Sequence, residues 1–151
     1  MKRFLSLVLA SCLVMFLSGA ALADFTVTQF EVKNDSLEIF VVEFHEATST
    51  DYDTEMVDEG HQRVFRDEAT AWFLTDTEYK YTVKLFVLKR KDPICSYEAT
   101  IVNRWNWTDW DFGPRVRSSE LKSLADNTSC TASKISSTED RSYYRIVFNG
   151  R

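Results

Sequence analysis

In the segment YKYTVKLFV, residues 79–87, every second side chain is apolar or aromatic. This period of two puts those side chains on one face of an extended strand and the lysines and threonine on the other. The same alternation recurs in 94–102, where Cys95 falls on the apolar face, and in 142–150, where Tyr144, Ile146 and Phe148 do. The chain is therefore predicted to fold into β-sheets that each bury one face and expose the other.

Weaker patterns complete the predicted fold. Strands are expected at 26–32 and 37–44, joined as a hairpin at Asn34–Ser36, and in 63–74. One short helix is predicted in 117–127, with Ser118 or Ser119 as its N-cap and with Leu121, Leu124 and Ala125 as a short apolar stripe. A polar loop is predicted at 128–140. The expected fold is all-β: an antiparallel β-sandwich, immunoglobulin-like or related, of about six or seven strands.

The N-terminus has the pattern of a bacterial-type signal peptide. Lys2 and Arg3 precede an apolar run that ends at Ala21-Leu22-Ala23, a small-x-small sequence of the kind cleaved by signal peptidase. We expect residues 1–23 to be removed after Ala23, leaving 24–151 as a single domain, secreted or periplasmic, without a membrane span. Lipidation of Cys12 is the alternative, because Leu9-Ala10-Ser11 precedes it as in lipoproteins.

The net charge indicates which partners the chain can bind, and the cysteines indicate a disulfide. The formal net charge is −5, and losing the two positive charges at Lys2 and Arg3 makes it −7. An acidic chain of this kind is not expected to bind nucleic acid, where Lys and Arg neutralise phosphates. Of the three cysteines, Cys95 and Cys130 follow the leader, and an exported domain with two cysteines is predicted to pair them in a disulfide.

Catalytic and metal-binding patterns are weak. His45 and His61 are the two histidines, and no Gly-x-Ser-x-Gly elbow accompanies them. The acidic segment 50–60 has the acid density of a calcium loop, but Met56 stands where an EF-hand needs glycine. We therefore predict no metal site and no cofactor. A small hydrolase that uses carboxylates, or His61 near the acidic segment, stays an alternative.

The segment 104–114, RWNWTDWDFGP, is the strongest functional signal, because it holds three of the four tryptophans. Three interpretations compete: packing of the rings in the core, an exposed edge that stacks on sugars or a partner's apolar groups, and a membrane-touching tip. In an extended chain Trp105 and Trp107 share one face while Trp110 and Phe112 share the other, so one pair at most is expected at a ligand. The candidate ligand-binding residues are Trp105, Asn106, Trp107, Asp109, Trp110, Asp111 and Phe112.

The function predicted from these observations is that of an exported, non-enzymatic binding domain. Its partner would be a protein or a glycan in the periplasm or outside the cell. A structural or assembly component that pairs through a strand edge is a further alternative. The sequence leaves the oligomeric state open.

Overall fold

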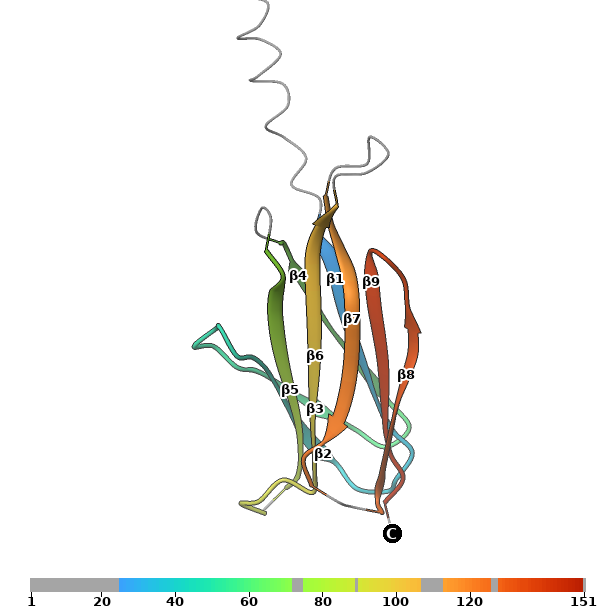
Figure 1. Ribbon diagram of the computed structural model, residues 1–151. Coiled ribbons are helices and arrows are strands. Elements are labelled where there is room, and N and C mark those ends of the chain that lie inside the picture. Colours follow the sequence, from blue (N-terminus) through green and yellow to red (C-terminus); the bar gives the residue numbers. More distant parts are fainter. Residues whose placement is uncertain (1–24, 72–74, 89, 107–112, 126–127, 151) are drawn as a thin grey trace, which may run out of the picture.

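The computed structural model describes residues 25–71, 75–88, 90–106, 113–125 and 128–150, and these residues form nine strands and no helix (Figure 1). The described residues therefore contain no helix that is long and apolar enough to cross a membrane. The strands are β1 (Thr26–Asn34), β2 (Phe40–Glu46), β3 (Asp53–Val57), β4 (Gln62–Ala69), β5 (Thr77–Val87), β6 (Cys95–Asn106), β7 (Gly113–Ser123), β8 (Cys130–Ser137) and β9 (Arg141–Phe148).

The strands form two sheets that pack together as a sandwich-like, all-β fold. One sheet has the order β4-β1-β9-β8 and the other has the order β3-β2-β5-β6-β7. All neighbouring pairs are antiparallel except β1 and β9, which run parallel side by side in the middle of the four-stranded sheet. The all-β class is thus confirmed, with more strands than expected.

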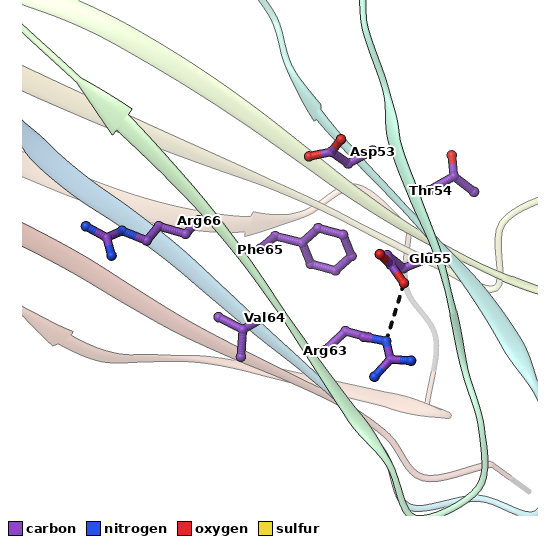
Figure 2. A pocket seen from close by; sticks show the side chains of 7 residues that line it. All are labelled: Asp53, Thr54, Glu55, Arg63, Val64, Phe65 and Arg66. Atoms are coloured by element: carbon purple, nitrogen blue, oxygen red, sulfur yellow. Dashed lines mark ion pairs between the residues drawn. The ribbon is translucent and has the colours of Figure 1, made fainter.

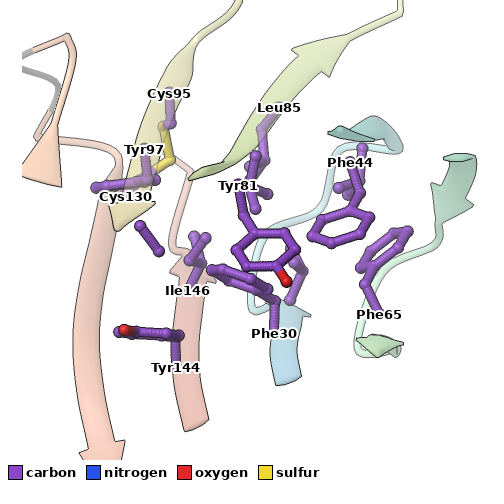
Figure 3. Packing of buried hydrophobic residues seen from close by; sticks show 14 of the residues in the cluster. Phe30, Phe44, Phe65, Tyr81, Leu85, Cys95, Tyr97, Cys130, Tyr144 and Ile146 are labelled. Atoms are coloured by element: carbon purple, nitrogen blue, oxygen red, sulfur yellow. A yellow bond between two sulfur atoms is a disulfide. The ribbon is translucent and has the colours of Figure 1, made fainter. Parts of the chain in front are cut away.

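The core lies between the sheets and is rich in aromatic rings (Figure 3). Phe30 of β1 stacks on Tyr144 of β9, with ring centroids 5.0 Å apart, and also contacts Phe44 and Tyr81 of the other sheet. The apolar faces predicted from the alternation are buried: Tyr81, Val83 and Leu85 in β5; Cys95, Tyr97, Ala99 and Ile101 in β6; and Tyr144, Ile146 and Phe148 in β9.

The predicted disulfide is present and buried. Cys95 begins β6 and Cys130 begins β8, so the bridge joins the two sheets, with 6.4 Å between the Cα atoms. A buried disulfide is compatible with an oxidising compartment such as the periplasm or the extracellular space.

The helix predicted in 117–127 is wrong, because 113–123 is the edge strand β7. Its residues pair with β6: Ser119 lies opposite Ile101 and is buried, and Leu121 lies opposite Ala99. Ser119 and Leu121 are two residues apart and face the other sheet, whereas the helix prediction relied on Leu121 and Leu124. Leu124 lies beyond the strand and is exposed, so pairing with β6 outweighed the local helix pattern.

Two loop predictions are also wrong. The polar segment 128–140 contains β8, whose side chains are mostly exposed because it is the edge of its sheet. The link at Asn34–Ser36 is no hairpin, since β1 and β2 belong to different sheets. Asn34 is fully buried and its side chain organises the crossing, donating hydrogen bonds to the carbonyl oxygens of Glu38 (2.7 Å) and Val57 (3.0 Å).

Candidate functional site

The aromatic segment connects two neighbouring strands at one end of the five-stranded sheet. Trp105 and Asn106 are the last residues of β6, and in register they face Pro114 and Gly113, the first residues of β7. The aromatic segment therefore begins at a strand end and leads into the next strand. Trp107, Asp109, Trp110, Asp111 and Phe112 lie outside the described residues, so only Trp105 and Asn106 of the predicted binding residues are placed.

A β-bulge shapes this end of the β6–β7 pair. Val102 lies opposite Ser118, but the next residue, Asn103, lies opposite Val116, so Arg117 is the extra residue. Bulges redirect side chains and are frequent beside functional sites. Beyond the bulge Arg104 and Arg115 lie directly opposite each other. Three arginines are thereby gathered next to Trp105.

A surface hollow of about 340 Å³ lies at this position, and we call it the tryptophan–arginine hollow. Trp105 is half-buried, and its indole Nε1 is among the buried atoms, so the part of its ring that reaches solvent is carbon. Asn106 is also half-buried. The residues that line the hollow are Arg104, Trp105, Asn106, Arg115, Val116, Arg117 and Glu139.

Asp76, just before β5, links two of the arginines. It accepts hydrogen bonds from Arg104 Nε (2.5 Å) and Nη2 (3.1 Å), and Arg117 Nη1 also donates to it. The hydrogen bond from Arg104 is the main reason why the pKa of Asp76 lies below its ordinary value, and the charges of Arg104 and Arg117 lower this pKa further. The pair of arginines is therefore held in place by a carboxylate that stays ionised.

Arg115 is held separately. Its Nη1 donates a hydrogen bond to the carbonyl oxygen of Pro114 at 3.0 Å, and its Nε lies 3.9 Å from Glu139 Oε2. The Arg115 side chain is only 20% exposed, whereas that of Glu139 is 83% exposed. An ion pair with one strongly exposed partner at this distance contributes little to stability. Arg115 is thus held by a hydrogen bond to the backbone of Pro114, and its charge acts on Asp140 as well as on Glu139.

A second hollow, of about 420 Å³, lies between the edge strands β3 and β4 (Figure 2). It is bordered by Asp53, Thr54 and Glu55 from one sheet and by residues 63–66 from the other. Arg63 Nε lies 3.4 Å from Glu55 Oε2, across the gap between the two sheets. Phe65 is nearly buried and stacks on Phe44, so the hollow reaches an aromatic ring of the core.

The contacts of the described residues do not join the two histidines considered for catalysis, His45 and His61, in one site. His61 lies in the β3–β4 connection, with Nδ1 2.9 Å from the carbonyl oxygen of Glu59. His45 lies at the end of β2, with Nε2 2.9 Å from Ser49 O and its ring stacked on Tyr52. Among the described residues, no group of three or more His, Cys, Asp or Glu side chains could hold a metal ion. The hydrolase alternative stays an untested prediction.

The sequence interpretation missed the charged half of the tryptophan–arginine hollow. The helix predicted in 117–127 includes Arg117, and the sequence pattern predicts no strand that would place Arg115 beside it. The signal that could have found them is the spacing of Arg115 and Arg117 two residues apart, directly after the aromatic segment, with Arg104 directly before it. Asp76 and Glu139 have no local signal, since they reach the site only through the fold.

The acidic segment 50–60, compared above with a calcium loop, contains the strand β3 at 53–57.

Comparisons with family models, with curated proteins and with solved structures give no match for this chain.

Proposed function

We propose that this chain is an exported binding domain, without an enzymatic activity of its own, that engages a glycan or protein partner through the tryptophan–arginine hollow. In this proposal residues 1–23 direct export and are removed, and 24–151 act in the periplasm or outside the cell as one immunoglobulin-like or related domain. The disulfide between the sheets supports the compartment.

The observation that carries the proposal is the composition of the hollow. Its lining brings together Trp105, whose indole nitrogen is buried, Asn106 and three arginines, all near one strand end. Binding sites are concave and pair apolar or aromatic surface with a few polar groups that fix the ligand's orientation. Tryptophan and arginine are also the residue types that most often dominate binding energy at protein interfaces.

Intrinsic tryptophan fluorescence and calorimetry of the mature domain test the proposal. We expect a ligand from a panel of envelope glycans and secreted proteins to change the emission, and Trp105→Ala to lower its affinity by roughly tenfold or more. Tyr52→Ala is the matched control, since Tyr52 is an exposed aromatic residue outside the hollow. A ligand whose affinity is the same in the wild type and in Trp105→Ala would contradict the assignment of the site.

A second candidate function, assembly through a strand edge, is favoured by the hollow between β3 and β4. Each of these strands is hydrogen-bonded on one side among the described strands, so both present an open edge. Met56 and Val64 are 58% and 51% exposed there. Open edges with apolar side chains are templates for strand addition by a partner or a second copy.

Light scattering after size-exclusion chromatography tests this candidate over a range of concentrations. Assembly predicts a mass that rises with concentration and falls in the variant Met56→Lys/Val64→Lys, because charges on an edge oppose strand addition. Leu124→Lys is the control at an exposed apolar residue outside these two strands. A monomer at all concentrations would remove self-assembly.

A further inference from the structure

The tryptophan–arginine hollow carries positive charge in a chain that is negative overall. Arg104, Arg115 and Arg117 line it together with one carboxylate, Glu139, and Asp76 adds a second carboxylate beside it. The lining alone carries three positive groups and one negative group, whereas the whole chain carries −5. Asp76 lies beside the lining as the counter-charge of Arg104 and Arg117, and Asp140 lies close enough to Arg115 for the two charges to attract each other. An anionic ligand is therefore attracted to this hollow and repelled by much of the remaining surface.

The placement of the arginines has a local cost. Arg104 and Arg115 lie directly opposite each other on antiparallel strands, and like charges in such positions destabilise the pair. Arg117 adds a third guanidinium at the bulge, where it shares Asp76 with Arg104. A purely structural role does not require three arginines in this arrangement. An anion bound beside them would offset their mutual repulsion.

Arg115 is the arginine best prepared to bind a carboxylate. Its side chain is mostly buried and its Nη1 is fixed on Pro114 O, so little conformational freedom is lost on binding. Guanidinium and carboxylate groups form two parallel hydrogen bonds that are stronger than hydrogen bonds between neutral groups. The exposed Glu139, 3.9 Å away, is a weak partner that a ligand carboxylate can replace.

The neighbours of the arginines favour a sugar over a peptide. Sugar rings carry an apolar face, which matches the carbon surface of Trp105. Their hydroxyl groups both donate and accept hydrogen bonds, and the amide of Asn106 can do the same. An acidic peptide offers the carboxylate but lacks a hydroxyl-rich ring.

We infer that the tryptophan–arginine hollow binds an acidic oligosaccharide, with a sugar ring against Trp105 and a sugar carboxylate on Arg115. This inference rests on the proposed function and names its ligand class. The positive charge of Arg104 and Arg117 selects the anionic sugar, and the hydroxyl groups next to the carboxylate meet Asn106.

Calorimetric titration of the mature, oxidised domain with a short oligogalacturonate tests the inference. We expect binding that weakens as salt is added, and a loss of at least about tenfold in affinity in Arg115→Gln. Glu139→Gln is expected to bind the acidic sugar more tightly, because the competing carboxylate is gone. Arg66→Gln is the matched control, since Arg66 is an exposed arginine on β4 that pairs with Glu68. Circular dichroism checks that each variant is folded.

Three further probes separate the possible failures: the methyl-esterified oligogalacturonate, a sulfated oligosaccharide and a polyglutamate peptide. Equal affinity for the ester and the acid would overturn the inference and leave the proposed binding function standing. Preference for the sulfated sugar would overturn the assignment of a carboxylate. Arg115-dependent binding of polyglutamate without sugar binding would replace the glycan by a protein partner. Absence of binding to every one of these probes, with unchanged tryptophan emission, would overturn the inference. The proposed function would be overturned separately, if no glycan and no protein of the wider panel bound the domain.

Discussion

The side-chain amide of Asn34, at the end of β1, donates a hydrogen bond to the carbonyl oxygen of Val57, at the end of β3, across 3.0 Å. These two strands belong to different sheets, so one amide group joins the sheets at the end where the chain crosses between them. The Asn34 oxygen also accepts hydrogen bonds from the backbone N–H (3.0 Å) and the hydroxyl group (2.7 Å) of Ser36. The amide thus serves as donor and as acceptor inside the protein.

Asn34→Ala is expected to lower the free energy of unfolding by about 2–4 kcal/mol, because buried backbone groups lose their partners. Urea denaturation followed by circular dichroism measures the change. Asp35→Ala is the control, since Asp35 is the exposed neighbour and its side chain pairs with the exposed Lys33. If the two substitutions lowered the free energy of unfolding equally, the hydrogen bonds of Asn34 would contribute little to stability.

Removal of the disulfide is the second prediction. Cys95 and Cys130 are 35 residues apart, and a loop of this length corresponds to about 4 kcal/mol in the chain-entropy model. We expect the double variant Cys95→Ala/Cys130→Ala to unfold at correspondingly lower urea concentration than the oxidised wild type. The reduced wild type serves as the control, because it lacks the bridge but keeps both side chains. Identical midpoints for the oxidised and reduced wild type would contradict the prediction.

The third prediction concerns acid. The pKa of Asp76 is lowered in the folded protein, first by the hydrogen bond from Arg104. A lowered folded-state pKa stabilises the protein above the ordinary value of 3.8, and this stabilisation is lost as pH falls through the folded-state pKa. An NMR titration of the Asp76 carboxyl should therefore give a midpoint below 3.8. The midpoint should rise towards 3.8 in Arg104→Gln; a midpoint that does not move would show that Arg104 is not the cause.

The fourth prediction concerns alkali. Burial raises the pKa of Tyr81 above its ordinary value of 10.0, and the nearby Asp67, which accepts a hydrogen bond from the tyrosine hydroxyl at 2.9 Å, raises it further. Because the folded-state pKa is raised, this contribution to stability is present below pH 10 and is lost as pH rises beyond the ordinary value. Tyr81→Phe should flatten the fall in stability at high pH, measured by thermal unfolding. The half-exposed Tyr143, changed to Phe, is the comparison; equal flattening in both variants would count against Tyr81.

The fifth prediction uses two glycines with left-handed backbone. Gly60 and Gly150 have φ values of 70° and 66°, so alanine is strained at both positions. A Cβ at Gly150 would lie 2.7 Å from Ser36 Cβ, whereas a Cβ at Gly60 meets no atom within 4 Å. Gly150→Ala should therefore destabilise the protein more than Gly60→Ala, by an extra 1 kcal/mol or so. Equal unfolding midpoints would show that the chain around Ser36 yields without cost.

Sequence alone predicted the central strands and the edge strand β4 but missed the edge strands β3, β7 and β8, for a physical reason. β5, β6 and β9 each bury one face, so burial imposes an alternation that can be read directly. β8 is an edge strand with mostly exposed side chains, so polar residues are tolerated at nearly all its positions. In β7, Ser118, Ser119 and Leu121 fit a capped helix pattern, so the sequence predicted a helix. The segment is a strand because it pairs with β6.

The candidate site was predictable only in its aromatic half. Trp105 and Asn106 are conspicuous in the sequence, and their place at a strand end follows from the pattern before them. The bulge that brings Arg117 beside Arg104 is a property of register, which no local pattern specifies. Asp76 comes from a distant part of the chain, and so its contact with both arginines needed the fold.

The parallel pairing of β1 with β9 has a consequence for biogenesis. Thr28 of β1 lies next to Ser142 and Phe30 next to Tyr144, so the middle of the four-stranded sheet joins residues made early to residues made late. A chain that emerges N-terminus first from a ribosome or a translocation pore cannot complete this sheet until Phe148 has followed. Until then β1 lacks one of the two neighbours that it has in the folded sheet.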